Sequence, residues 1–140
     1  SEGEAPEPPP STCGNRIVGT NGPDRIRGTA GADLILGRGG RDRLRGGRGG
    51  DCVRGGSGAD RIRGGGGSDR LNGGRGKDRI WGGRGKDRVS GGRGADLIKV
   101  AGGGRDVVRC GPGDDTAVVD RRDAVRGGCE SVRFRRARAV

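Results

Sequence analysis

The chain has 140 residues, of which 36 are glycine, whereas tryptophan and phenylalanine occur once each and tyrosine is absent. So few large apolar side chains cannot fill an ordinary globular core, and the length allows one domain at most. The excess of 29 basic over 18 acidic residues gives a net charge of +11 and favours polyanionic partners: nucleic acid, acidic polysaccharide or an anionic surface. The alternative is that the arginines only keep strand surfaces solvated.

Residues 1–12 are acidic and proline-rich, and we expect them to form a disordered leader. No apolar stretch is long enough for a transmembrane helix. The first residue is not methionine, so we expect either a mature chain without its signal peptide or a shortened form of the protein. Residues 13–18 are predicted to cap the fold, because Ile17 is in phase with the repeat that follows.

A nine-residue repeat begins at residue 19 and ends at residue 118. It is clearest in Gly-Gly-Arg-Gly-Lys-Asp-Arg-Ile-Trp at residues 73–81. In all eleven units the fourth place is glycine and the eighth is aliphatic. The single extra residue Val100 interrupts the period and predicts a bulge. The sixth place is always aspartate: Asp24, Asp33, Asp42, Asp51, Asp60, Asp69, Asp78, Asp87, Asp96, Asp106 and Asp115.

Each fixed place has a physical role. One aliphatic residue between two polar ones is typical of a short strand that buries one side chain. The glycines allow a tight turn and leave backbone carbonyls free to face a ligand. An aspartate beside open carbonyls supplies the hard oxygen ligands that calcium takes. The repeat therefore predicts stacked units that each consist of a strand and a metal-binding turn.

The pattern Gly-Gly-x-Gly-x-Asp-x-aliphatic-x resembles the RTX, or haemolysin-type, calcium-binding repeat. The resemblance implies an all-β, right-handed parallel β-roll over residues 19–118, with two units per turn and several Ca²⁺ ions between turns. It implies that aspartates of units i and i+2 share an ion with turn carbonyls. One edge would hold Asp24, Asp42, Asp60, Asp78, Asp96 and Asp115, and the other Asp33, Asp51, Asp69, Asp87 and Asp106.

Both ends of the repeat depart from the family pattern. Thr20, Thr29 and Arg38 stand in place of the second glycine of units 1 to 3. Units 10 and 11 begin with Ala101 and Cys110 rather than glycine. Adjacent aspartates along the two edges allow up to roughly nine ions, and we expect about five to seven because the ends differ.

The apolar content is too small to stabilise this fold alone. Each buried aliphatic side chain contributes roughly 1.5–3 kcal/mol. Ordering each backbone residue costs roughly 1–2 kcal/mol, and there are nine residues per aliphatic place. We therefore expect folding to be coupled to calcium binding.

If alternate units lie on opposite faces, the odd-numbered units place their seventh and ninth residues on one face. That face would be a cationic plate and a candidate polyanion-binding surface. It would hold Arg25, Arg27, Arg43, Arg45, Arg61, Arg63 and Arg79, with Trp81 at its end.

The C-terminal segment changes character after unit 11. Residues 119–132 are predicted to be a C-terminal cap, and residues 133–140 a basic, disordered tail. The turn at Cys110 and the pair Cys129-Glu130 resemble the closing segment of secreted actinobacterial proteins with the same repeats.

Four cysteines without histidine or a close Cys-x-x-Cys pair favour two disulfides over a zinc site. Cys110–Cys129 would fasten the cap to the last turn, and Cys13–Cys52 follows as the remaining pair. Disulfides require an oxidising compartment, so we expect the protein to be secreted; free thiols in a cytosolic protein are the alternative.

No catalytic constellation is visible, because histidine and tyrosine are absent and the few serines and threonines have no base partner. We therefore expect a protein that is not an enzyme. The competing hypothesis is a disordered RNA-binding protein, since residues 45–47, 54–56 and 63–65 each read Arg-Gly-Gly. Aspartates in regular register and the near absence of aromatics argue against it.

Overall fold

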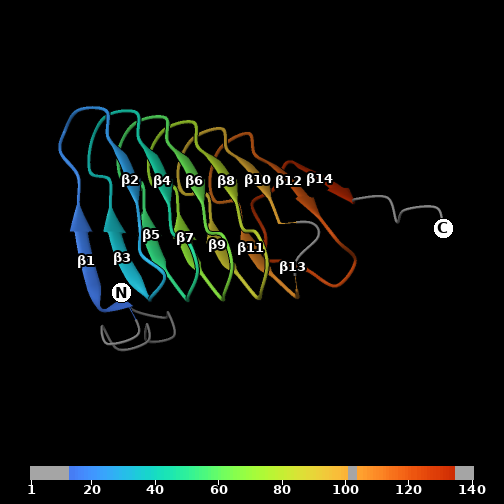
Figure 1. Ribbon diagram of the computed structural model, residues 1–140. Coiled ribbons are helices and arrows are strands. Elements are labelled where there is room, and N and C mark those ends of the chain that lie inside the picture. The colour runs from blue at the N-terminus through green and yellow to red at the C-terminus, as the bar shows by residue number, and fades with distance from the viewer. Residues whose placement is uncertain (1–12, 101–103, 135–140) are drawn as a thin grey trace, which may run out of the picture.

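The computed structural model describes residues 13–100 and 104–134, and every regular element among them is a β-strand. The strands form two parallel sheets (Figure 1). The first sheet contains, in order, β1 (Asn15–Val18), β3 (Asp33–Leu36), β5 (Cys52–Arg54), β7 (Arg70–Asn72), β9 (Arg88–Ser90), β11 (Val107–Arg109) and β13 (Ala124–Val125). The second sheet contains β2 (Arg25–Arg27), β4 (Arg43–Arg45), β6 (Arg61–Arg63), β8 (Arg79–Trp81), β10 (Leu97–Lys99), β12 (Thr116–Val119) and β14 (Ser131–Phe134).

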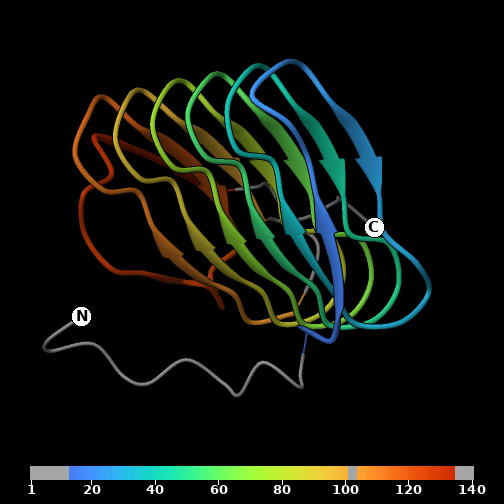
Figure 2. The ribbon, with the colours of Figure 1, turned by 90° about the vertical axis from the view of Figure 1, so that its left-hand side faces the viewer.

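Two successive units make one turn of a parallel β-roll, as predicted. Strands that are neighbours in a sheet come from units i and i+2, so Arg61 pairs with Arg43 on one side and Arg79 on the other. Figure 2 shows the successive turns stacked along one axis, with the chain passing from one sheet to the other in each turn. Odd-numbered and even-numbered units therefore lie on opposite faces.

The core consists of the aliphatic eighth-place side chains of both sheets. Leu44 and Ile62 from the second sheet and Val53 from the first are each at most 1 % exposed. Ile17 and Ile26, in the first turn, pack against this column but are only partly buried. The side chain of Ile17 lies in the same register as Ile35, so β1 covers the first complete turn of its sheet.

In units 3 to 9 and in unit 11 the backbone is left-handed at the second and fourth places. In unit 5 these are Gly56 and Gly58, with φ of 85° and 105°. An L side chain rarely adopts this conformation, so glycine is favoured there. Arg38, at the second place of unit 3, nevertheless has φ of 70°.

The extra residue Val100 is accommodated without interrupting the stack. Its side chain is 1 % exposed and belongs to the core, and its N–H donates to the Val118 carbonyl. The Asp87-to-Asp106 step along the edge consequently contains 19 residues instead of 18.

Beyond the repeats, β13 and β14 each add a strand to the C-terminal end of a sheet. β14 pairs with β12 and includes Arg133 and Phe134, so these two residues are in a strand rather than in the disordered tail expected from residue 133. The remaining tail, residues 135–140, and the predicted leader, residues 1–12, lie outside the described residues.

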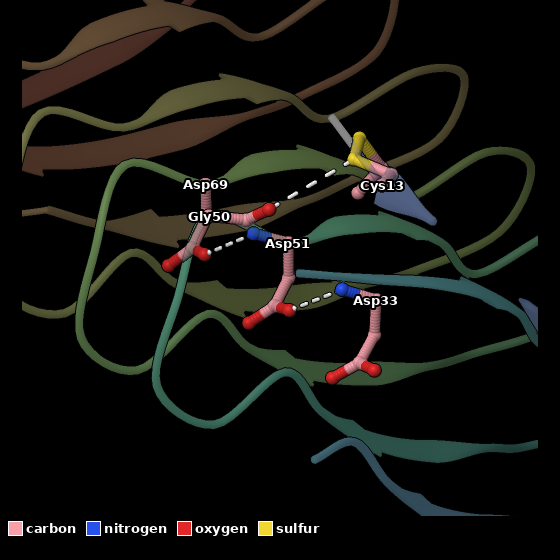
Figure 3. The surroundings of a disulfide bond; sticks show 6 residues. Cys13, Asp33, Gly50, Asp51 and Asp69 are labelled. Atoms are coloured by element: carbon pink, nitrogen blue, oxygen red, sulfur yellow. Dashed lines mark hydrogen bonds between the residues drawn. A yellow bond between two sulfur atoms is a disulfide. The ribbon is translucent and has the colours of Figure 1, made fainter. Parts of the chain in front are cut away.

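Two disulfides join the pairs predicted from the sequence, Cys13–Cys52 and Cys110–Cys129. The first joins Cys13, two residues before β1, to Cys52 at the start of β5, with a sequence separation of 39 (Figure 3). The second fastens the segment between β13 and β14 to the turn after β11. Each disulfide therefore ties an end segment to a turn of the roll.

Candidate calcium sites

The aspartates form one ladder along each edge of the roll. From Asp24 to Asp96, the backbone N–H of each sixth-place aspartate donates to Oδ1 of the aspartate one turn further on, at 2.9 Å for Asp60 to Asp78 and for Asp69 to Asp87. Figure 3 shows part of one ladder, with Asp33, Asp51 and Asp69 stacked. The ladders contain the two sets of residues expected for the two edges.

The second carboxylate oxygen is buried and unpaired along most of both ladders. Within the described part of the chain no hydrogen-bond donor reaches Oδ2 of Asp42, Asp51, Asp60, Asp69, Asp78, Asp87, Asp96, Asp106 or Asp115. Each of these side chains is at most 2 % exposed. A buried acceptor without a partner costs about 1–3 kcal/mol, and more when it is charged, so these oxygens require a proton or a cation.

The pKa values of these carboxyls reflect the same requirement. Burial raises the pKa of Asp78 and Asp87 to about 8, and that of Asp60 and Asp69 to about 7. The hydrogen bond from the backbone of the preceding aspartate opposes this shift, and the charge of neighbouring carboxylates adds to it. The pKa falls toward the ends, being about 6 for Asp51.

The glycine at the first place of a unit allows the aspartate oxygen to pack closely against its Cα. A Cβ placed on Gly55 would lie 2.5 Å from Asp60 Oδ2 and 2.7 Å from the Gly73 carbonyl oxygen of the next turn. A carboxylate oxygen and a backbone carbonyl oxygen of the next turn thus lie close together beside a glycine that has no room for a side chain. The same arrangement recurs at six unpaired carboxylates: Asp42, Asp51, Asp60, Asp69, Asp78 and Asp96. At Asp87 the corresponding carbonyl belongs to residue 101, outside the described residues.

This donor set fits a hard cation. Among the described residues no three acidic, cysteine or histidine side chains converge on one point, so a metal site must draw on backbone oxygens as well. Carboxylate and carbonyl oxygens together are what Ca²⁺ prefers, and its flexible coordination tolerates such mixed sites. The aspartates of adjacent turns and the turn carbonyls are the residues that would hold it.

The first two units are arranged differently, because threonine replaces their second glycine. The Thr29 N–H donates to Asp33 Oδ2 at 2.6 Å, and its hydroxyl donates to Oδ1 at 2.8 Å. Thr20 contacts Asp24 in the same way, at 2.7 and 3.0 Å. Burial raises the pKa of Asp33, yet these hydrogen bonds and one from Asn15 outweigh it and leave that pKa below its usual value. Asp24 and Asp33 therefore have donors where the later aspartates have none.

Two residues that the sequence did not single out complete one ladder. Asn15 donates from Nδ2 to Asp33 Oδ1 at 2.9 Å and so occupies the aspartate place one turn earlier. Asp123 accepts from the Asp106 N–H at 2.9 Å and from the Asp120 N–H at 2.7 Å. The 18-residue spacing from Asn15 to Asp33 could have revealed the first, whereas Asp123 is out of phase with the repeat.

The family model for the RTX calcium-binding nonapeptide repeat (4 copies) matches residues 18–51, 51–80 and 63–98, which together exceed half of the chain. The chain belongs to this family. Its RTX repeats thus combine a calcium-binding sequence pattern with a ladder of buried aspartates in a parallel β-roll. Comparison with curated proteins and with solved structures finds no match. In the described part of the RTX chain, no helix is long and apolar enough to cross a membrane.

The structure also brings the predicted arginine face together on the second sheet. The strand register aligns Arg25, Arg43, Arg61 and Arg79 in one row, called here the seventh-place row. It aligns Arg27, Arg45, Arg63 and Trp81 in another, the ninth-place row. All seven arginines are exposed, and the Arg63 guanidinium lies 5.2 Å from the centre of the Trp81 ring.

The Arg-Gly-Gly segments do not form a disordered chain. Arg45, Arg54 and Arg63 each end a strand, and the glycines after them form turns of the roll. Arg54 lies in the first sheet and the other two in the second, so the three arginines do not share a face.

Proposed function

We propose that this protein is a secreted, non-catalytic calcium-binding β-roll whose folding is coupled to ion binding. The observation that carries the proposal is the set of buried, unpaired Oδ2 atoms that lie close to a first-place glycine and to a carbonyl oxygen of the next turn. Six such sites have all three components among the described residues, which supports a load of about five to seven ions. The two disulfides support export, because such bonds persist in oxidising compartments.

The eleven aspartates of the sixth place, Asp24 to Asp115, are the proposed metal ligands, with those from Asp42 onward favoured by their unpaired oxygens. The absence of histidine and tyrosine from the sequence supports a role without catalysis. Each of these eleven aspartates already has a place in a ladder, which supports a structural role for them over acid–base chemistry.

The test is a calcium titration followed by circular dichroism, with the bound ions counted calorimetrically. We expect a largely unfolded chain in metal-free buffer after reduction of the disulfides, and strand signal that develops as calcium is added. Magnesium is the control, since its strict octahedral geometry and tightly held water suit mixed carbonyl sites poorly. Full strand content in reduced, metal-free protein would refute the coupling of folding to calcium.

We further propose that the arginine face of the second sheet binds polyanions in the folded state. The register that aligns exposed arginines turn after turn supports this, because the unfolded chain would scatter them. The side chains of the seventh-place row form no ion pair with a described acidic residue. We expect the protein to elute from immobilised heparin at higher salt with calcium than without it. Equal elution would mean that net charge alone is responsible.

A further inference from the structure

A groove runs along the edge of the roll where the strands of the second sheet begin. Its volume is about 820 Å³, and it extends over five turns, from the first unit to the ninth. One wall is the seventh-place row, Arg25, Arg43, Arg61 and Arg79. The opposite wall is formed by fifth-place residues, which include Arg41 and Lys77. All six of these cationic side chains are exposed.

We propose that this groove binds one extended chain of an acidic polysaccharide, carrying sulfate or carboxylate groups, laid along the axis of the roll. The proposal rests on the polyanion-binding function proposed above and assigns it to one side of the arginine face. The ninth-place row, at the other end of the same strands, would then contribute little.

The size of the groove favours a single chain. Turns are about 4.8 Å apart, so a volume of about 820 Å³ over five turns corresponds to a cross-section on the order of 40 Å². This admits one flexible chain with its side groups. It does not admit a nucleic-acid duplex, whose major groove alone is about 12 Å wide.

The spacing of the cations favours a polymer with a regular repeat. The seventh-place row presents an arginine at every turn, about 4.8 Å apart. On the opposite wall Arg41 and Lys77 alternate with Ala59 and Ala95, so a cation recurs at every second turn. An extended sugar chain advances per unit by a distance similar to one turn. A polymer with acidic groups on successive or alternate sugars would therefore stay in register with both walls.

The side chains that line the groove favour an acidic polysaccharide over single-stranded nucleic acid. Guanidinium groups bind sulfate and carboxylate through two parallel hydrogen bonds. Proteins that bind single-stranded nucleic acid combine such charges with aromatic side chains on which bases stack. No aromatic residue lines this groove, and Trp81 lies in the ninth-place row under the Arg63 guanidinium. The groove therefore offers charge without a stacking platform.

Four aspartates of one ladder, Asp24, Asp42, Asp60 and Asp78, also line the groove. All but Asp24 are buried, and the Oδ1 atoms of Asp42, Asp60 and Asp78 accept backbone N–H groups. As ionised groups they would weaken the attraction for a polyanion. Bound calcium would offset that charge, so polysaccharide binding should require calcium for electrostatic reasons as well as for folding.

The test measures the affinity of the full-length, disulfide-intact protein for a heparin oligosaccharide in saturating calcium. Two triple variants of the second sheet remove the same charge: Arg43, Arg61 and Arg79 to Ser, and Arg27, Arg45 and Arg63 to Ser. We expect the first to bind roughly tenfold or more weakly and to lose about two to three units of salt-dependence slope. We expect the second to change affinity by less than about threefold, since its arginines lie outside the groove.

A second pair of variants covers the case in which a triple variant fails to fold. Arg41 and Lys77 to Ala removes the fifth-place cations of the groove. Lys86 and Arg105 to Ala removes the fifth-place cations of the opposite edge, which are also exposed. Calcium-induced strand signal verifies the folding of each variant.

The outcomes separate the two proposals. If the wild-type protein fails to bind heparin in calcium, the polyanion-binding function itself is refuted. If seventh-place and ninth-place variants lose affinity equally, that function stands and the groove assignment is wrong. Tighter binding of a single-stranded or duplex DNA of equal length than of heparin would overturn the polysaccharide as the partner.

Discussion

Gly55 shows how a missing side chain lets two oxygens come together at a proposed calcium site. A Cβ placed on Gly55 would lie within 2.7 Å of both Asp60 Oδ2 and the Gly73 carbonyl oxygen. We expect Gly55→Ala to weaken calcium binding at that turn and to lower the calcium-loaded stability by about 1–3 kcal/mol. Thermal unfolding in calcium measures this loss.

The matched control is Gly66, at the third place of unit 6. A Cβ on Gly66 would meet no atom within 4 Å, and its backbone is not left-handed. Gly66→Ala should therefore leave stability and ion count unchanged. A loss equal to that of Gly55→Ala would mean that only chain flexibility matters.

The buried carboxyls also predict how the calcium-free protein responds to pH. Burial raises their pKa in the folded roll, to about 8 for Asp78 and Asp87 and about 6 for Asp51, from an unfolded value of 3.8. The folded state therefore binds more protons than the unfolded state between about pH 4 and pH 8. We expect the calcium-free, disulfide-intact roll to be most stable below this window and to lose stability as pH rises through it. Denaturant unfolding across these pH values would reveal an error if stability rose instead.

In the first turn, Thr29 donates hydrogen bonds to the aspartate carboxylate, and we expect a bound ion to satisfy the corresponding carboxylates of later turns. Thr29→Val keeps the shape but removes the 2.8 Å hydrogen bond to Asp33 Oδ1. We predict a loss of about 0.5–1.5 kcal/mol with no change in the number of ions bound. Calorimetric counting that finds one ion fewer would show that Thr29 supports a metal site instead.

At the scale of the turn, each aspartate couples its neighbours on both sides. The Asp60 N–H donates to Asp78 Oδ1, and Asp60 Oδ1 in turn accepts from Asp42. Asp60→Ala should therefore disturb two adjacent turns, and Asp115→Ala, near the end of its ladder, only one. We expect the central change to cost about twice as many ions. Equal losses of calcium from the two variants would contradict the assignment of these residues to one edge.

The repeated turns are well predicted from the sequence, because three features recur with the same nine-residue period. The aliphatic place, the aspartate and the turn glycines recur together, so strands such as β6 and β7 fall at their expected residues. The cysteine pairs were also predicted, because Cys110–Cys129 would fasten the cap to the last turn and Cys13 and Cys52 then remained. The strands and turns of the repeat follow from residue spacing, which can be read directly from the sequence.

The ends could not be predicted to the same degree. β13 and β14 follow no nine-residue period, and Asp123 enters its ladder 17 residues after Asp106. The hydrogen bonds of Thr20 and Thr29 depend on where a hydroxyl lies relative to a carboxylate, which the residue type alone does not state. The contacts at the two ends do not recur along the chain, so no repeated sequence pattern predicts them.

In the whole molecule, one 18-residue turn is the smallest segment whose deletion leaves every other strand in its own sheet. Deleting residues 55–72 joins unit 4 to unit 7 and keeps every later strand in its own sheet. We expect this shortened protein to fold with calcium and to bind about two ions fewer. Deleting residues 55–63 alone should move every later strand to the opposite sheet, so that Arg70 and Arg88 take the places of Arg61 and Arg79 in the seventh-place row. Because this row would still hold an arginine at each of its first four turns, we expect the nine-residue deletion to keep most of the heparin affinity.

The strands of one turn pair only with those of the turns before and after it. The number of turns in this roll is therefore not fixed by a core that all strands share. A gene segment that encodes one turn can be copied or lost, and the new neighbours meet the same surfaces that the old ones met. Only the two ends, with their disulfides and their own hydrogen bonds, have to be kept. Selection can thus adjust reach and ion capacity together, in whole steps, by recombination alone.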